Sequence, residues 1–169
     1  EGYFDLQPLL VRDVAEPPVA ADVLVGRSIV AGSQLIKQPD VLMIHHLVPD
    51  EAVAGSLRHN LDFYAPRTAH GSSLSPAVMA LLHARAGQPD AALELPRLSL
   101  RIDLDDLGGT TSGGVHIGAC GGAWQAVVAG FLGARVSRGR LRLDPVLPTR
   151  WPELEVRFSC LGTDVRVHV

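Results

Sequence analysis

Three apolar segments with helical spacing constrain the fold of this chain more than any other feature of its sequence. They are residues 39–48, 76–86 and 117–131. Each is apolar on nearly every side, a pattern that indicates a helix buried all round. Gln38, Ser75 and His116 mark the starts of these segments and lie 37 and 41 residues apart, so each interval has room for one helical hairpin.

Two amphipathic segments lie between the apolar ones. Residues 50–64 and 88–102 repeat apolar side chains at helical spacing, which predicts an outer layer of helices. Pro96 should kink or split the second of them, because proline lacks an amide hydrogen. Inner helices that all run the same way, each followed by an outer helix, form part of an α/α toroid with its ligand site at one end of the inner ring. The hairpins show no strong sequence similarity to one another, so this prediction depends on pattern alone.

The two ends of the chain follow other patterns. Residues 1–33 are rich in proline and small residues, and we expect a mostly irregular leader with no clear core of its own. After Gly133 the apolar period changes to two, which predicts antiparallel strands, with residues 161–163 as the turn between the last two. The predicted fold class is therefore mainly α with a small β module. Residues 1–132 would form part of a helical barrel, and residues 133–169 a small C-terminal β-sheet domain.

Composition excludes several classes of function. The 169 residues are 47% hydrophobic, enough for a substantial core. A formal net charge of −3 without a basic cluster argues against a nucleic acid partner, and no apolar run reaches the roughly 18 residues of a membrane span. Cys120 and Cys160 are too few for a disulfide framework, and the sequence has no metal-ligand cluster. We expect a cytoplasmic protein without metal or cofactor, and the missing initial Met predicts a piece of a longer polypeptide.

Lys37 is the only lysine in a chain with 15 lysine and arginine residues in total. A compact ammonium group with three donors suits a sugar hydroxyl or a phosphate oxygen, whereas the planar guanidinium of arginine suits a carboxylate. The alternative is an ordinary surface lysine in a composition biased toward arginine.

Polar motifs precede all three apolar helices. Lys37 and Gln38 precede the first, Ser72 and Ser73 the second, and a glycine-rich loop ending at His116 the third. Unpaired amide groups and a partial positive charge at a helix N-terminus favour anions. If the motifs converge at one end of a toroid, they would form a cavity for a polyhydroxy ligand together with an oxyanion.

Each of these residues also has a structural alternative. The serines, with Ser75, could simply cap a helix, and His116 could be a satisfied core histidine. Two further histidines, His45 and His46, are interpreted as structural, and Trp124 as a core residue rather than a sugar platform.

A general acid is missing from the sequence. Inverting glycosyl transfer needs a carboxylic acid that protonates the leaving oxygen. None of the glutamates has a convincing setting, because they fall on the outer helices, in the β module or in the leader. Asp103, Asp105 and Asp106 could line the loop before the third helix, but such an acidic run is more often solvated. We expect that this chain holds no catalytic residue and only part of an active site.

Several stretches together resemble the C-terminal part of glycoside hydrolase family 65, which includes maltose, trehalose and kojibiose phosphorylases and some hydrolases. The matching stretches are EGYF at 1–4, KQPDV at 37–41, NLDFY at 60–64, SSLSP at 72–76, RIDLDD at 101–106, GVH at 114–116 and GGAW at 121–124. The resemblance implies the last hairpins of an (α/α)6 barrel followed by a small β-sheet domain.

The resemblance also implies an activity and partners. These enzymes cleave an α-glucosidic bond with inversion, using inorganic phosphate, or water in the hydrolases, and a glutamate that would lie upstream of this chain. Lys37 and Gln38 look like the family's glucosyl-binding pair, and Ser72, Ser73 and His116 like its phosphate-binding residues. The expected partners are an α-glucoside disaccharide, inorganic phosphate, the rest of a longer polypeptide, and a second copy in a homodimer.

The chain departs from the family pattern at three places. Ala65 stands where the family usually has Glu, Gly71 where Asp is common, and residues 112–114 where Ala-Glu-Gly is common. Fewer carboxylates beside an anion site would favour phosphate electrostatically. Phosphorolysis and hydrolysis both remain open, and a third alternative is a non-catalytic module whose exposed inner helices form a binding surface.

Overall fold

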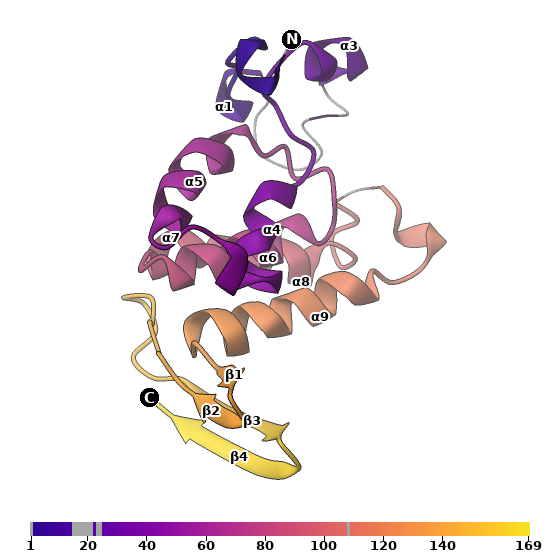
Figure 1. The fold of residues 1–169 in the computed structure, drawn as a ribbon. Coiled ribbons are helices and arrows are strands. Elements are labelled where there is room, and N and C mark those ends of the chain that lie inside the picture. The colour runs from indigo at the N-terminus through magenta and orange to yellow at the C-terminus, as the bar shows by residue number, and fades with distance from the viewer. Residues whose placement is uncertain (1, 15–21, 23–24, 108) are drawn as a thin grey trace.

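Helices occupy the chain as far as Phe131, and short strands follow (Figure 1). The structure is a computed structural model that describes residues 2–14, 22, 25–107 and 109–169. Its helices are η1 (Tyr3–Asp5), α1 (Val11–Val14), α3 (Arg27–Ala31), α4 (Asp40–Leu47), η2 (Pro49–Glu51), α5 (Ser56–Tyr64), η3 (Ala65–Arg67), α6 (Ser75–Arg85), α7 (Pro89–Ala92), α8 (Glu94–Arg101), η4 (Thr111–Gly113), α9 (Ile117–Gln125) and the π-helical turn η5 (Ala126–Phe131). The strands are β1 (Arg135–Ser137), β2 (Arg140–Arg142), β3 (Glu155–Cys160) and β4 (Thr163–His168). The prediction of a mainly α chain with a small β module is confirmed. Within the described ranges, every helix is too short or too polar to cross a membrane.

Helix α6 lies at the centre of the helical part and contacts α4, α5, α7, α8, α9 and η5. Met79, Leu81 and Leu82 on one side of α6 form a buried cluster with Leu42 of α4 and Leu61 of α5. Alanines on its other side pack against η5, where Phe131 is fully buried. The sequence prediction that the segment 76–86 is buried all round is therefore confirmed.

The leader is tied to the helical body through a few contacts. Val11 packs with Leu35 and Ala69, so the described part of residues 1–33 shares a small cluster with later segments. The Tyr3 hydroxyl donates a hydrogen bond to the Gln34 carbonyl (2.6 Å), and the Tyr3 ring packs against aromatic rings at the end of α5. Short helices (η1, α1 and α3) take up about half of the described residues of this leader, so it is less irregular than predicted. Residues 1, 15–21 and 23–24 lie outside the described ranges.

A short parallel pairing brings the first polar motif beside the second. Ile36 and Thr68 form a β-bridge, and the Ala69 amide donates to the Ile36 carbonyl (2.7 Å). One step further on, the Gly71 amide donates to the Lys37 carbonyl (2.9 Å). The backbone at Lys37 is thereby fixed next to the loop that leads into α6.

The two predicted outer helices are both interrupted. Residues 50–64 were predicted as one helix, but η2 ends at Glu51 and α5 starts at Ser56, after Gly55 in a left-handed conformation (φ 77°). Residues 88–102 divide into α7 and α8 on either side of Leu93. Pro96 lies in the first turn of α8, where an amide hydrogen would have no partner within the helix, so the predicted split occurs just before the proline.

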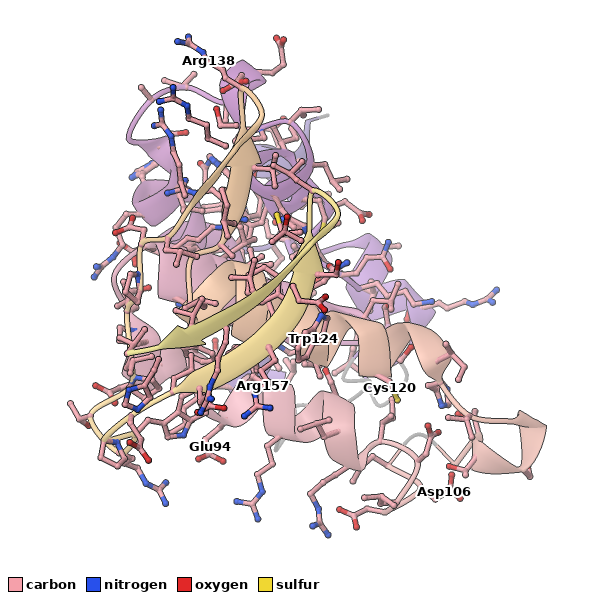
Figure 2. The ribbon with its side chains drawn as sticks, turned by 90° about the horizontal axis from the view of Figure 1, so that it is seen from below. Glu94, Asp106, Cys120, Trp124, Arg138 and Arg157 are labelled. Carbon is pink, nitrogen blue, oxygen red and sulfur yellow. The ribbon has the colours of Figure 1, made fainter. Side chains whose placement is uncertain are left out.

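Two of the three predicted buried helices expose one face in this chain. Leu42 of α4 is buried, but Val41, Ile44 and Leu47 are exposed. On α9, Trp124 is 50% exposed and lies one turn after the exposed Cys120 (Figure 2). The interpretation of Trp124 as a core residue was wrong, because none of the described segments packs on that face.

The C-terminal strands form two separate antiparallel hairpins below the helices (Figure 1). β1 pairs with β2, and β3 pairs with β4 through a two-residue turn in which Leu161 (φ 51°) and Gly162 (φ 76°) both have positive φ. Trp151, before β3, packs against Phe131 at a ring-centroid distance of 4.8 Å. The boundary predicted at residue 132 stays a prediction, although it falls between the last helical turn and the first strand.

Candidate functional site

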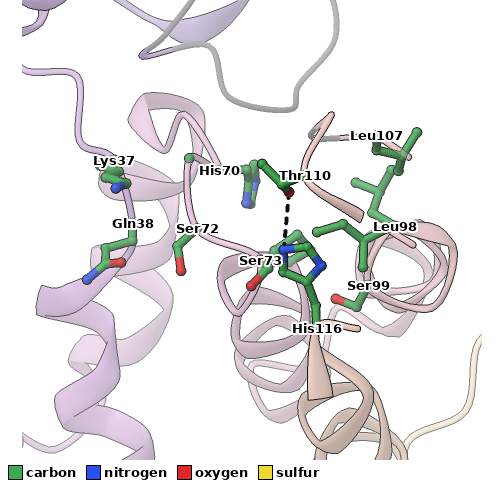
Figure 3. A pocket seen from close by; sticks show the side chains of 13 residues that line it. Lys37, Gln38, His70, Ser72, Ser73, Leu98, Ser99, Leu107, Thr110 and His116 are labelled. Carbon is green, nitrogen blue, oxygen red and sulfur yellow. Dashed lines mark hydrogen bonds between the residues drawn. The ribbon is translucent and has the colours of Figure 1, made fainter. Parts of the chain in front are cut away.

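One cavity of about 460 Å³ contains all five residues that the sequence singled out (Figure 3). Its lining consists of Lys37, Gln38, His70, Gly71, Ser72, Ser73, Pro76, Leu98, Ser99, Ile102, Leu107, Thr110 and His116. The candidates come from three segments separated by more than 30 residues each in the sequence, so only the fold brings them together.

Three helix N-termini open toward this cavity. Gln38 directly precedes Pro39, the N-cap of α4; Ser72 and Ser73 lie just before α6; and His116 is the N-cap of α9. Figure 3 shows the labelled side chains of these residues around one space, with Lys37 and Gln38 on one side and His116 on the other. Free amide groups and the partial positive charge of each helix end therefore add to the electrostatics of the site.

Lys37 and Gln38 form one wall of the cavity. The Lys37 side chain is exposed, and its backbone is fixed by the Gly71 amide. The Gln38 Nε2 donates to Asp40 Oδ1 (2.8 Å), which leaves the Gln38 carbonyl oxygen available to accept from a ligand hydroxyl. A cation beside an amide is a suitable pair for a sugar with many hydroxyl groups.

The two serines form the floor at the start of α6. Ser72 Oγ accepts a long hydrogen bond from the Leu74 amide (3.4 Å), so its hydroxyl proton can still be donated to a ligand. Ser75 does not cap the helix, because the N-cap residue is Leu74 and the Ser75 hydroxyl instead contacts His70 Nδ1 (2.8 Å). The capping interpretation of Ser75 was therefore wrong.

His116 is held at the opposite wall by Asp103. The His116 Nδ1 lies 2.5 Å from Asp103 Oδ1, and the His116 backbone amide donates to Asp103 Oδ2 (2.8 Å). Both side chains are largely buried, with 25% of His116 and 16% of Asp103 exposed. The hydrogen bond from His116 holds the pKa of Asp103 below its usual range, so the carboxylate is ionised at neutral pH. The remaining ring nitrogen, Nε2, lies 3.3 Å from Thr110 Oγ1.

Four residues of the site are not among the candidates that the sequence singled out. His70, Ser99 and Thr110 line the cavity, and Asp103 lies behind His116. Asp103 was interpreted as part of a solvated acidic run, but its carboxylate is mostly buried and fully paired. Ser99 sits in an outer helix, and its hydroxyl is buried without a hydrogen-bond partner among the described residues. The sequence signal for His70, Thr110 and Asp103 was their place in or near the polar motifs, whereas Ser99 had none.

The position of Gly71 has a steric reason in this chain. A Cβ built at Gly71 would overlap the carboxylate of Asp22, whose Oδ1 is buried without a described hydrogen-bond partner. Any side chain at residue 71 would have to displace Asp22. Asp22 of the leader therefore lies directly against Gly71, which is a residue of the cavity wall.

The charge of the cavity favours an anion. Among the described residues that line it there is no Asp or Glu, while it offers an ammonium group, two imidazoles and four hydroxyls. Burial lowers the pKa of His70 to about 4, so that ring is neutral at physiological pH and Lys37 supplies a positive charge. The arrangement can bind an oxyanion next to a polyhydroxy ligand, but its described lining includes no carboxylic acid that could protonate a leaving oxygen.

Comparison with known proteins assigns the chain to a family. The model of the glycosyl hydrolase family 65 central catalytic domain matches residues 3–125, and the chain therefore belongs to glycosyl hydrolase family 65. It is 34% identical, over its whole length, to kojibiose phosphorylase from Caldanaerobacter subterraneus subsp. tengcongensis, of which it covers 22%. It is 39% identical over 98% of its length to maltose phosphorylase from Bacillus subtilis, and again covers 22% of that relative.

A solved structure shows the same fold. A protein provisionally described as a kojibiose phosphorylase from the human microbiome superposes with a TM-score of 0.86 over the whole chain, at 28% sequence identity. The chain covers 24% of that protein, and 17–23% of the length of the curated relatives that it matches.

Proposed function

We propose that this chain supplies the phosphate site and part of the glucosyl site of an inverting α-glucoside phosphorylase. In this proposal Ser72, Ser73 and His116 bind inorganic phosphate, while Lys37 and Gln38 bind the glucosyl unit. Phosphate then attacks the anomeric carbon, and a glutamate outside this chain protonates the leaving oxygen. The relatives named above are phosphorylases of kojibiose and maltose, which supports this class of reaction.

The observation that carries the proposal is the cavity itself. Five polar residues from three distant segments line one space, and no carboxylate is among its described lining. A phosphate dianion would be repelled by a carboxylate and attracted by an ammonium group and helix N-termini. A hydrolase cavity that supplied both catalytic carboxylates itself would have acidic residues in its lining.

The proposal also accounts for the exposed apolar faces of α4 and α9. Val41, Ile44, Leu47 and Trp124 are all exposed in this chain. Several large apolar side chains exposed on one helix, as on α4, are typical of an interface. We infer that further helices of an (α/α)6 barrel cover it, and that α4, α6 and α9 are inner helices of that barrel.

The decisive experiment is an assay of the longer polypeptide that carries this chain. Purified enzyme is incubated with kojibiose, maltose or trehalose, with and without inorganic phosphate, and glucose 1-phosphate and glucose are measured. We expect phosphate-dependent release of β-glucose 1-phosphate from at least one of them, because inversion at an α-linkage gives the β-product. Equal release of glucose without phosphate would identify a hydrolase instead.

Single substitutions test the assignment of the two halves of the cavity. Ser73→Ala should raise the KM for phosphate by about tenfold, and Lys37→Ala should raise the KM for the disaccharide by a similar factor. Ser56→Ala is a matched control, because Ser56 lies at the exposed start of α5, away from the cavity. If the enzyme is active but Ser73→Ala leaves the KM for phosphate unchanged and Lys37→Ala leaves the KM for the disaccharide unchanged, the assignment is contradicted. A well-folded polypeptide that has no activity and binds neither ligand would favour an interaction module.

A further inference from the structure

Asp103 contacts His116 at two points at once. One carboxylate oxygen accepts from the His116 backbone amide, and the other lies against Nδ1 of its ring. Asp103 comes from the loop after α8 and is not part of the cavity lining, whereas His116 is. Any effect of Asp103 on a ligand in the cavity would therefore be transmitted through His116.

The contact determines which ring nitrogen carries a proton. An ionised carboxylate can only accept hydrogen bonds, so His116 Nδ1 must be the donor. The hydrogen bond from His116 holds the pKa of Asp103 low, which is consistent with an ionised carboxylate. Nε2, which lies beside the cavity residue Thr110, is then the nitrogen left for a ligand.

We propose that Asp103 is a positioning residue of the phosphate site, which fixes both the orientation and the Nδ1-protonated form of His116 so that the unprotonated Nε2 accepts a hydrogen bond from a protonated oxygen of the phosphate. The inference deepens the proposed function and rests on it for the identity of the ligand. Asp103 itself does not touch phosphate. A carboxylate that holds an imidazole in one tautomer determines whether the second ring nitrogen donates or accepts a hydrogen bond.

A purely structural alternative exists, in which Asp103 only closes the loop between α8 and α9. Neighbouring carboxylates do serve the loop: Asp106 Oδ1 accepts from the Thr111 amide (3.0 Å), and Asp105 pairs with Arg101. The two roles predict different results for Asp103→Asn. An asparagine has a single acceptor oxygen, so it can serve the His116 amide or the ring Nδ1–H but not both.

If the oxygen of the introduced asparagine stays on the backbone amide, its NH₂ group faces Nδ1 and requires an unprotonated nitrogen there. The substitution should then move the proton of neutral His116 from Nδ1 to Nε2, as occurs when the buried aspartate of a serine protease triad is replaced by asparagine. Asp105→Asn is the matched control, because it makes the same chemical change two residues away without a contact to His116.

The direct test is the ¹⁵N spectrum of ring-labelled histidine in the 169-residue protein, with His116 assigned from its absence in His116→Gln. The wild-type protein and Asp105→Asn should show a protonated Nδ1, and Asp103→Asn a protonated Nε2 with a bare Nδ1. An unprotonated Nδ1 in the wild-type protein overturns the proposal, and this result does not depend on whether the variant folds.

The functional test uses steady-state kinetics of the longer enzyme. Asp103→Asn should raise the KM for inorganic phosphate by about tenfold or more, with the KM for the disaccharide changed by less than about twofold, and Asp105→Asn should change neither. In a His116→Gln background the effect of Asp103→Asn should disappear, because Asp103 acts through His116. Effects that add in the double variant overturn the proposal. Absence of any phosphate-dependent turnover in the wild-type enzyme refutes the proposed function instead and leaves the spectroscopic result standing.

Discussion

At the residue scale, burial decides which cavity groups can carry charge. His70 lines the cavity, its Nδ1 lies 2.8 Å from the Ser75 hydroxyl, and burial lowers its pKa to about 4. A histidine with no carboxylate partner therefore stays neutral inside the wall, whereas His116 is paired with an ionised carboxylate. Two imidazoles that line one cavity thus have different electrostatic roles because their environments differ.

The lowered pKa of His70 predicts a loss of stability in mild acid. The unfolded histidine has a pKa near 6.5, so between about pH 6.5 and pH 4 the unfolded chain binds a proton that the folded chain does not. The free energy of unfolding should therefore fall as the pH drops through this window, by roughly 3 kcal/mol at most from His70. His83, whose pKa burial also lowers, acts in the same direction.

Urea unfolding between about pH 4 and pH 7 measures this dependence. His70→Gln, which keeps a polar group next to Ser75, should have a shallower loss of stability toward acid than the wild-type protein. His59→Gln should keep the wild-type dependence, because His59 is exposed. An unchanged pH dependence in His70→Gln would show that the ring is not buried in its neutral form.

At the element scale, small residues set how closely α9 approaches α6. A Cβ built at Gly122 would lie 2.8 Å from the Cβ of Ala77, and the Ala77 Cβ cannot rotate away because it is attached directly to the backbone. The neighbouring Gly121 is exposed, and a Cβ added there would meet no atom within 4 Å. Because α9 carries His116 at its N-cap, this close approach also fixes one wall of the cavity.

Two adjacent glycines should therefore respond in opposite directions to the same substitution. Gly122→Ala should lower the free energy of unfolding by about 1–3 kcal/mol, because α9 must move away from α6. Gly121→Ala should raise it by up to about 1 kcal/mol, because alanine favours the helix and meets no neighbour. Equilibrium denaturation in urea distinguishes the two, and a stabilising Gly122→Ala would mean that the helices are less closely packed than described.

At the scale of the whole molecule, the chain exposes apolar helix faces that would ordinarily pack against other segments in a hydrophobic core. Val41, Ile44 and Leu47 on α4 are exposed although the helix is apolar nearly all round. The sequence predicted burial for these residues, and within this chain the prediction is wrong because no described segment lies on that side. In the longer polypeptide proposed above, the same side chains would be buried.

Ile44→Asp tests this difference between the chain and the longer polypeptide. In the 169-residue protein it should reduce self-association in sedimentation experiments with little loss of stability, because it removes exposed apolar surface. In the longer polypeptide it should destabilise by several kcal/mol, because a charge would be buried without a partner. The control is Leu104→Asp, at a side chain that is 79% exposed. It should change stability little in the 169-residue protein and in the longer polypeptide. A neutral effect of Ile44→Asp in both would argue against a covering layer of helices.

The sequence by itself determined the starts of the three apolar helices to within a residue, the change of period after Gly133 and the candidate residues. Local signals are enough to place Lys37, Ser72 and His116 next to helix N-termini. These signals are the helical spacing, the polar motifs, Pro39 and Pro76. The roles of these residues as sugar and phosphate ligands stay predictions.

Only the tertiary structure decided which of these residues share a cavity and which others join them. Asp103 meets His116 because the loop between α8 and α9 folds back on itself, and Lys37 meets the Ser72 loop because Ile36 pairs with Thr68. Exposure of the α4 and α9 faces likewise depends on which segments are present to cover them. Such contacts join residues that no short window contains, so the pattern of apolar and polar residues along the chain cannot specify them.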